Sequence, residues 1–198
     1  MRRIDELLQD KKGLYDSAYE HDACGVGMLV DIHGRKSHQI VDSALTVLEN
    51  MRHRGAEGAD NKSAGIMVQI PHEFILLQGI PVPEKGRYGT GLVFLPKDQE
   101  AQKAFLQVIK EEVEAKGLSF LCVRDVPVCS EILGEEALST EPAVKQLFIV
   151  GGEDQQELEL KLYLVRKRIE KRITESSLAG KKDFYVVSLS TRRLIYKG

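Results

Sequence analysis

Three segments of the chain carry apolar residues at every third or fourth position, which is the spacing of one helix face. They cover residues 38–52, 98–116 and 157–174. Ser37 stands before the first segment as an N-cap, and Gly117 follows the second as a stop. The third has acidic residues at its start and basic residues at its end, as the helix dipole favours. We predict three amphipathic helices, and we interpret the basic run of the third as a solvated face.

Apolar runs of strand length lie between these helices. They are residues 24–32, 64–70, 88–95, 118–126, 145–150, 183–190 and 193–196, the last two joined by a tight turn. Short helical segments are predicted at 2–9, 72–78 and 135–138. The strands come in pairs between helices, unlike the strict alternation of a doubly wound parallel sheet. The pattern predicts an α+β fold in which two sheets pack face to face with helices outside.

Composition is that of one globular domain, with 198 residues, 42% hydrophobic and 29% charged. The net charge of -2 comes from residues 1–23, and it argues against nucleic acid or an anionic membrane as a partner. No apolar run approaches the ~20 residues of a membrane span. Residues 1–23 lack the apolar centre of a secretory signal, so we expect a cytoplasmic protein.

The cysteines Cys24, Cys122 and Cys129 are odd in number and scattered, which indicates free thiols rather than a disulfide framework. Cys122 and Cys129 have no histidine nearby, so no metal site is expected. The sequence also lacks a glycine-rich phosphate loop, a His-Glu-x-x-His motif and a Gly-x-Ser-x-Gly motif.

Cys24 stands directly before Gly25-Val26-Gly27, at the head of a predicted strand and behind a polar leader. One interpretation is that the leader is removed after Ala23, so that Cys24 becomes an N-terminal nucleophile whose own amine assists its thiol. The other is a buried structural cysteine, because free cysteines are commonly small core residues.

The first long helix runs into Arg52-His53-Arg54-Gly55, and a polar loop follows. Basic residues at a helix C-terminus complement the negative end of the dipole. Alternatively, one of the arginines points back toward the thiol of Cys24. The local pattern leaves both interpretations open.

Several segments along the sequence resemble a known family. The match to the glutaminase domain of the large chain of glutamate synthases, which are class II, N-terminal-nucleophile amidotransferases, rests on residues 16–27, 44–45, 48–56, 59–62, 69–74, 88–91, 188–191 and 195–198. Essentially the whole chain is covered. The segments around Cys24 and Arg52–Gly55 are the most specific.

The resemblance implies a four-layer αββα N-terminal-nucleophile hydrolase fold, of which this chain is the N-terminal part. Residues 1–23 are then a propeptide, and residues 24–198 belong to the amidotransferase domain. Cys24 attacks the side-chain amide of glutamine and Arg54 assists at the substrate. The ammonia released passes to synthase domains of the complete chain, where 2-oxoglutarate becomes glutamate. No cofactor is implied in this segment; FMN and an iron–sulfur cluster are expected elsewhere, with ferredoxin or a small electron-donor subunit as a partner.

The chemistry of an N-terminal cysteine supports this assignment. A thiol with a pKa of about 8.5 is only a few per cent thiolate at neutral pH. An α-amine titrates at about 7.7–8.0, so it is a base matched to the working pH. While residues 1–23 are attached that nitrogen is an amide, and we expect the uncleaved chain to be inactive.

Two departures from the family bear on function. The family usually has Gly-Asp-Gly between the positions of Ser63 and Ala64, whereas this chain passes directly from one to the other. The family's arginine for the glutamine carboxylate and its Asn-Gly oxyanion pair fall beyond Gly198, so we expect residues 1–198 alone to be inactive. The alternative functions are an N-terminal-nucleophile amidase acting on another amide, or a non-catalytic remnant of the fold.

Overall fold

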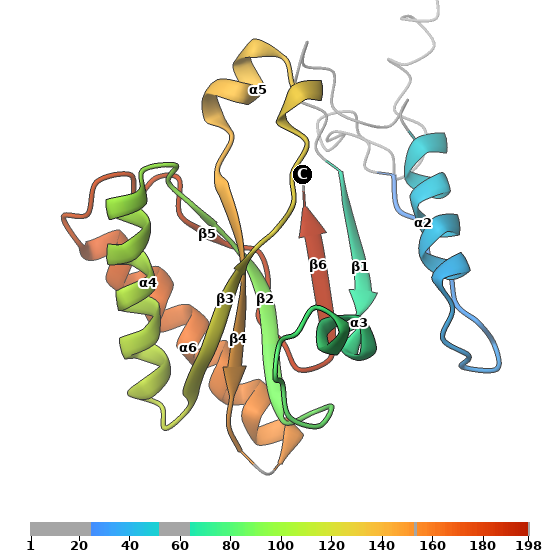
Figure 1. Ribbon diagram of the computed structural model, residues 1–198, viewed down its shortest axis with the longest axis horizontal. Helices are drawn as coiled ribbons and strands as arrows, with labels where there is room; N and C mark the ends of the chain where they lie inside the picture. Colours follow the sequence, from blue (N-terminus) through green and yellow to red (C-terminus); the bar gives the residue numbers. More distant parts are fainter. Residues whose placement is uncertain (1–24, 52–63, 153, 198) are drawn as a thin grey trace, which may run out of the picture.

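The computed structural model describes residues 25–51, 64–152 and 154–197 (Figure 1). The helices are α2 (His38–Asn50), α3 (His72–Leu77), α4 (Gln99–Glu114), the 3-10 turn η3 (Ser130–Ile132), α5 (Glu135–Thr140) and α6 (Gln155–Glu175). The strands are β1 (Gly65–Gln69), β2 (Tyr88–Leu95), β3 (Ser119–Asp125), β4 (Ala143–Val150), β5 (Tyr185–Val186) and β6 (Arg193–Lys197). The three long helices and most of the strands therefore confirm the sequence pattern.

The strands form two antiparallel sheets. The larger has the order β3-β4-β2-β5, and the smaller pairs β1 with β6. β2 and β4 pair over their full length, from Tyr88 opposite Val150 to Leu95 opposite Ala143. This long central ladder forms the frame on which the other elements are arranged.

Helices cover one face of the four-stranded sheet, and the two-stranded sheet lies over the other. Along β2, Val93 and Leu95 point into a core shared with Phe105 of α4 and Leu162 of α6. Leu92, the neighbouring residue, points the other way and packs against side chains that include Leu194 of β6. α2 lies beside β1 on the outer side of the small sheet (Figure 1). Strand alternation thus lets β2 serve two cores at once.

Side-chain caps fix the starts of the long helices, as the sequence predicts for α2. Ser37 Oγ accepts a hydrogen bond from the Gln39 amide at 3.1 Å, Asp98 caps α4 at 2.8 Å, and Asp154 caps α6 at 2.7 Å. Each cap satisfies one of the amide groups that a helix start leaves unpaired.

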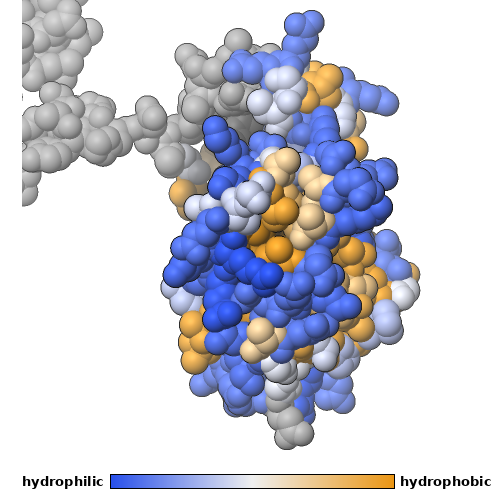
Figure 2. All heavy atoms as spheres, turned by 90° about the vertical axis from the view of Figure 1, so that its left-hand side faces the viewer, coloured by the Kyte–Doolittle hydropathy of each residue, from blue (hydrophilic) through white to orange (hydrophobic). Residues whose placement is uncertain are grey.

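The outer surface of α4 and its surroundings is mostly hydrophilic, with hydrophobic side chains gathered in a few groups (Figure 2).

Charged residues also join α4 to α6. Glu112 of α4 is almost fully buried and accepts hydrogen bonds from Arg168 Nε at 2.6 Å and Arg172 Nη1 at 3.1 Å. No helix among the described residues is long and apolar enough to cross a membrane.

The strand predicted at residues 24–32 is wrong for its described part, residues 25–32, which form no strand. Val26, Met28, Val30 and Ile32 are largely exposed. An alternating apolar segment needs a neighbouring strand to pair with, and β1 pairs only with β6 within the described chain. The helix predicted at 2–9 lies outside the described residues.

The two strands predicted at residues 183–190 and 193–196 are confirmed only in part. The second forms as β6, whereas the first is limited to β5. They do not pair with each other, because β5 pairs with β2 and β6 pairs with β1 in the other sheet. Between them the chain crosses from one sheet to the other while staying bonded to β2, through the Val187 amide to the Leu92 carbonyl and through a bridge between Thr90 and Ser190. Local sequence indicates two extended segments here, but their partners are distant in sequence.

Candidate functional site

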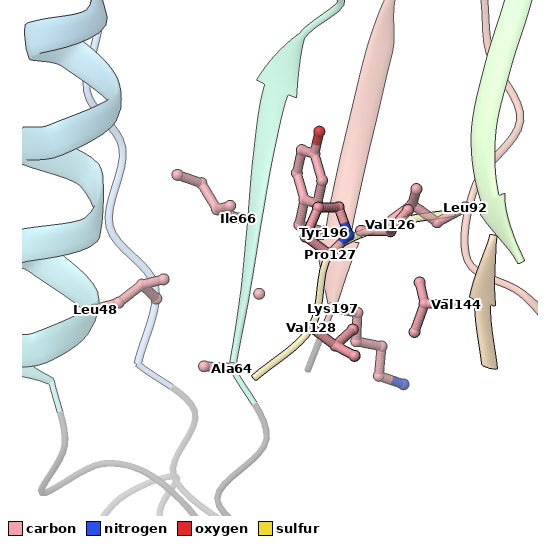
Figure 3. A pocket seen from close by; sticks show the side chains of 11 residues that line it. Leu48, Ala64, Ile66, Leu92, Val126, Pro127, Val128, Val144, Tyr196 and Lys197 are labelled. Atoms are coloured by element: carbon pink, nitrogen blue, oxygen red, sulfur yellow. The ribbon is translucent and has the colours of Figure 1, made fainter. Parts of the chain in front are cut away.

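A cavity of about 280 Å³ opens where the two sheets end together (Figure 3). Leu48 of α2 lies on one side, Leu92 and Val144 of the large sheet lie on the other, and Ile66 and Tyr196 stand between them. The complete lining is Leu48, Ala64, Gly65, Ile66, Leu92, Val126, Pro127, Val128, Val144, Tyr196 and Lys197. The cavity is therefore mainly apolar, with its polar groups supplied by the end of β6.

Two polar side chains of β6 border this cavity. Burial raises the pKa of Tyr196, and the nearby Arg124 charge offsets this only in part, so the phenol stays protonated at neutral pH. Lys197 Nζ lies 4.9 Å from the centre of the Tyr185 ring, a distance at which the ring face attracts a cation. Tyr196 and Lys197 thus add a phenol and an ammonium group to a lining that is otherwise apolar.

A chain of buried polar groups runs through the large sheet next to the cavity. Arg124 Nε donates to Gln146 Oε1 at 3.0 Å, and Gln146 Nε2 donates to Thr90 Oγ1 at 3.0 Å. Thr90 Oγ1 in turn donates to the Leu147 carbonyl at 2.8 Å. Gln146 lies directly opposite the lining residue Leu92. Because every member has a partner, the chain holds β2, β3 and β4 in register without an unsatisfied buried group.

The two residues assigned to the site from sequence, Cys24 and Arg54, lie outside the described residues. The chain that leads to them is described. Gly27 lies against the C-terminal half of α2, because a Cβ built on it would be 2.5 Å from Val47 Cγ1 and 3.8 Å from Met51 Cε. The structure therefore brings together the segment that follows Cys24 and the segment that precedes Arg54.

Four segment ends lie on the side of the molecule where the cavity opens. Figure 1 shows the start of the described chain, the C-terminal end of α2, the start of β1 and the end of β6 on this side. Ala64 and Lys197, at two of these ends, line the cavity itself. The lining by β6 and by residues 126–128 was not predicted from sequence, since it depends on pairing between remote strands.

Of the two other thiols, that of Cys122 is poorly suited to catalysis. Cys122 and Cys129 are free, and burial raises the pKa of the Cys122 thiol, which lowers its thiolate fraction. Among the described residues no group of three or more His, Cys, Asp or Glu side chains could hold a metal ion.

Comparison with known proteins decides the family. Residues 24–198 match the model of the family described as "Glutamine amidotransferases class-II". The chain belongs to this family. The class II amidotransferase match begins at Cys24, so it leaves out the polar residues 1–23.

Glutamate synthases are among the similar proteins. The chain is 41% identical to "Glutamate synthase [NADH]" of Saccharomyces cerevisiae, over 97% of this chain and 10% of the yeast protein. It is 37% identical to "Glutamate synthase [NADPH] large chain" of Bacillus subtilis, over 94% of this chain and 13% of that protein. It is also 37% identical to "Ferredoxin-dependent glutamate synthase 2" of Synechocystis, over 90% of this chain and 12% of that protein. The chain thus spans about a tenth of the length of these relatives.

Proposed function

We propose that this chain is the glutaminase segment of a glutamate synthase and that Cys24 is its nucleophile. The observation that carries the proposal is the family match, which begins at Cys24 and leaves residues 1–23 outside. In this proposal residues 1–23 are a propeptide, and cleavage after Ala23 frees the α-amine of Cys24.

The proposed reaction uses the Cys24 thiol together with the α-amine that this cleavage frees. The α-amine takes the proton of the Cys24 thiol, and the sulfur attacks the side-chain amide carbon of glutamine. The carbon–nitrogen bond then breaks, the proton passes to the leaving nitrogen, and ammonia departs. Water hydrolyses the thioester to give glutamate and the free thiol. Ammonia passes to synthase domains, where 2-oxoglutarate, FMN, an iron–sulfur cluster and an electron donor complete the synthesis.

We propose Arg54 as the residue that orients the thiol or the bound substrate. Gly27 and Met51 lie near each other, since a Cβ built on Gly27 would be 3.8 Å from Met51 Cε, and each of the two site residues is three positions away from one of them. Three residues of extended chain span at most about 11 Å. This short reach favours a site shared by Cys24 and Arg54 over a role for Arg54 limited to the helix dipole.

The layers support the N-terminal-nucleophile fold as part of the proposal. α4 and α6, the large sheet, the small sheet and α2 follow one another across the molecule (Figure 1). In this arrangement α2 is the fourth layer, and the cavity lies at the open end between the two sheets.

The test is the state and reactivity of Cys24 in the complete protein that contains this chain. Mass spectrometry is expected to find Cys24 at the mature N-terminus, and a diazo-ketone analogue of glutamine is expected to label Cys24 while leaving Cys122 and Cys129 unlabelled. Cys24→Ser is expected to lower kcat for glutamine hydrolysis at least about 10³-fold. Full activity in an uncleaved protein contradicts the nucleophile assignment. A cleaved protein that neither reacts with the analogue nor hydrolyses glutamine indicates a remnant of the fold.

A further inference from the structure

The connection between β3 and β4 projects beyond the large sheet at the cavity end of the molecule (Figure 1). We call residues 126–142, which include η3 and α5, the β3–β4 excursion. It exposes four apolar side chains: Ile132 is 80% exposed, Val128 56%, Leu138 43% and Leu133 37%. Such a concentration of exposed aliphatic groups on one projection is typical of a contact surface.

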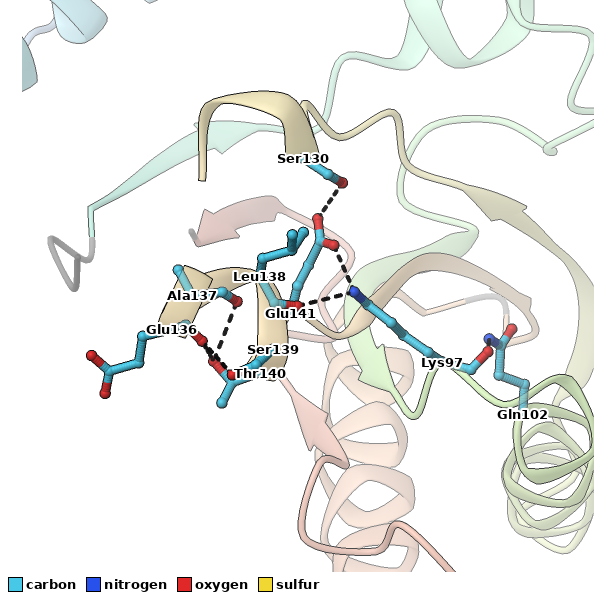
Figure 4. Close-up of polar contacts among 9 residues, drawn as sticks. All are labelled: Lys97, Gln102, Ser130, Glu136, Ala137, Leu138, Ser139, Thr140 and Glu141. Atoms are coloured by element: carbon cyan, nitrogen blue, oxygen red, sulfur yellow. Dashed lines mark hydrogen bonds and ion pairs between the residues drawn. The ribbon is translucent and has the colours of Figure 1, made fainter. Parts of the chain in front are cut away.

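The β3–β4 excursion is held in shape at its base. The Glu141 carboxylate accepts a hydrogen bond from Ser130 Oγ at 2.6 Å and pairs with Lys97 Nζ at 2.9 Å (Figure 4). Lys97 Nζ also donates to the Leu138 carbonyl at 3.3 Å, and the Val126 amide donates to the Val144 carbonyl at 3.1 Å. The bonds from Ser130 and Lys97 lower the pKa of Glu141. Glu141 is therefore ionised at neutral pH, and the contacts that hold the lower part of the β3–β4 excursion are formed. A surface fixed in advance loses less conformational entropy on binding.

The charge of the β3–β4 excursion has one sign. Residues 126–142 contain four glutamates and no lysine, arginine or histidine. Glu141 pairs with Lys97, whereas Glu131, Glu135 and Glu136 are exposed and have no ion pair within the described part of the chain. A second copy meeting this surface about a two-fold axis would place glutamates against glutamates, which is unfavourable. An anionic membrane or a nucleic acid is disfavoured for the same reason.

The β3–β4 excursion is continuous with the cavity. Val126, Pro127 and Val128 belong to it and also line the cavity wall. A partner seated on the exposed aliphatic groups therefore covers the side of the cavity mouth that these residues form. The matched region is only 10–13% of the length of these relatives, so most of each relative lies outside it.

We propose that the β3–β4 excursion is the docking surface for the synthase portion of the same longer polypeptide. That portion meets Ile132, Leu133 and Leu138 with apolar side chains, and it meets Glu131, Glu135 and Glu136 with lysines and arginines. Docking there places the synthase portion against the cavity mouth, at the end of the molecule toward which the segments leading to Cys24 and Arg54 run. The inference rests on the proposed function, since it presumes a synthase portion that receives ammonia.

The test is carbodiimide cross-linking of the complete protein, mapped by mass spectrometry and paired with a coupling assay. Glu135 and Glu136 are expected to join lysines of the synthase portion, which follows the rest of the amidotransferase domain in the same polypeptide. Ile132→Asp is expected to reduce these cross-links about fivefold and to raise the ammonia released into solution per glutamate synthesised. Leu77→Asp is the matched control, because Leu77 is 83% exposed on α3, at the opposite end of the small sheet (Figure 1); it is expected to change neither readout.

Three outcomes would overturn the docking proposal. Cross-links confined to the amidotransferase domain, within residues 1–198 or in its continuation beyond Gly198, cross-links between two copies, or an Ile132→Asp protein with unchanged cross-links and unchanged ammonia release each exclude it. Failure of the proposed function gives a different result, because the unsubstituted protein then hydrolyses no glutamine whatever its cross-links.

Discussion

At the scale of single residues, Gly91 shows how closely the chain crosses over the central strand. A Cβ built on Gly91 would lie 1.7 Å from the Ser188 carbonyl oxygen and 2.9 Å from Leu189 Cα. These are backbone atoms of the segment that passes from the large sheet to the small one. The crossing is possible because position 91 has no side chain.

Gly91→Ala is therefore expected to be strongly destabilising. The added methyl group meets backbone that is bonded on both sides to β2, so we expect a loss of about 3 kcal/mol in the free energy of unfolding. Gly89→Ala is the matched control, because the nearest atoms to its Cβ belong to the Leu162 side chain and not to backbone; we expect a loss of about 1–2 kcal/mol. Urea unfolding followed by circular dichroism measures both, and equal losses would contradict the role of the crossing.

The sequence could not reveal why glycine stands at position 91. The run Tyr88-Gly89-Thr90-Gly91 is recognisable as a family signature, and its strand is predicted correctly, with the same bounds as β2. The neighbour that requires the glycine is Ser188, almost a hundred residues later. A close approach of this kind depends on topology, which local periodicity does not contain.

At the scale of elements, Glu159 of α6 fixes the turn between β5 and β6. Its carboxylate accepts hydrogen bonds from Ser190 Oγ at 2.7 Å, the Thr191 amide at 2.7 Å and Thr191 Oγ1 at 2.6 Å. Burial raises the pKa of Glu159, but the bonds from Thr191 and Ser190 outweigh it and hold the pKa below its usual range. The helix layer is thus tied to the strand that carries Tyr196 and Lys197 to the cavity.

The stabilisation from Glu159 is expected to depend on pH. Because the pKa is lower in the folded state, the unfolded state binds more protons in acid, and the contribution is complete above the unfolded pKa of about 4.3. It is lost as the pH falls through the folded pKa. We expect Glu159→Gln to lower the free energy of unfolding by about 1–2 kcal/mol at pH 7, since the carboxylate is partly solvated.

The comparison that checks this uses urea unfolding at pH 7 and at about pH 3. The difference between the parent protein and Glu159→Gln should shrink in acid. Glu157→Gln, on the same helix with an exposed carboxylate paired to Lys161, should cost less at pH 7. A difference for Glu159→Gln that is constant with pH would refute the assignment.

Sequence periodicity identified helices better than strands. α4 and α6 follow from apolar spacing and end residues, because a helix satisfies its backbone within itself. A strand finds its partners elsewhere, so residues 25–32 and 183–190 have the right pattern without forming the strands expected. For the candidate site, the sequence names Cys24 and Arg54, whereas the cavity walls around Leu92, Val144 and Tyr196 arise only from the packing of two sheets.

At the scale of the whole molecule, the described chain divides into a well-packed centre and a lightly packed margin. β2, β4, α4 and α6 contain most of the fully buried side chains. α2 contains none, and the apolar side chains of residues 26–32 are mostly exposed. Regions with few buried apolar groups open at lower free-energy cost than the core.

Native-state hydrogen exchange is expected to show this division. Amides in the middle of α2 should exchange at least about 100-fold faster than amides in the middle of α6, because local opening of α2 exposes little buried apolar surface. α4 serves as the internal control and should exchange as slowly as α6, with which it shares a core. Equal protection of α2 and α6 would show that the margin is as stable as the centre.

The pairing of β1 with β6 also bears on how the chain is made. Gly65 lies opposite Lys197, so the backbone groups of β1 have no partner strand until β6 has been synthesised. At a synthesis rate of about 5–20 residues per second, the interval between the two strands is on the order of ten seconds. The large sheet has its strands β2, β3 and β4 much earlier, and it can form as a platform during translation. The cavity between the sheets is therefore among the last features of this region to be completed on the ribosome.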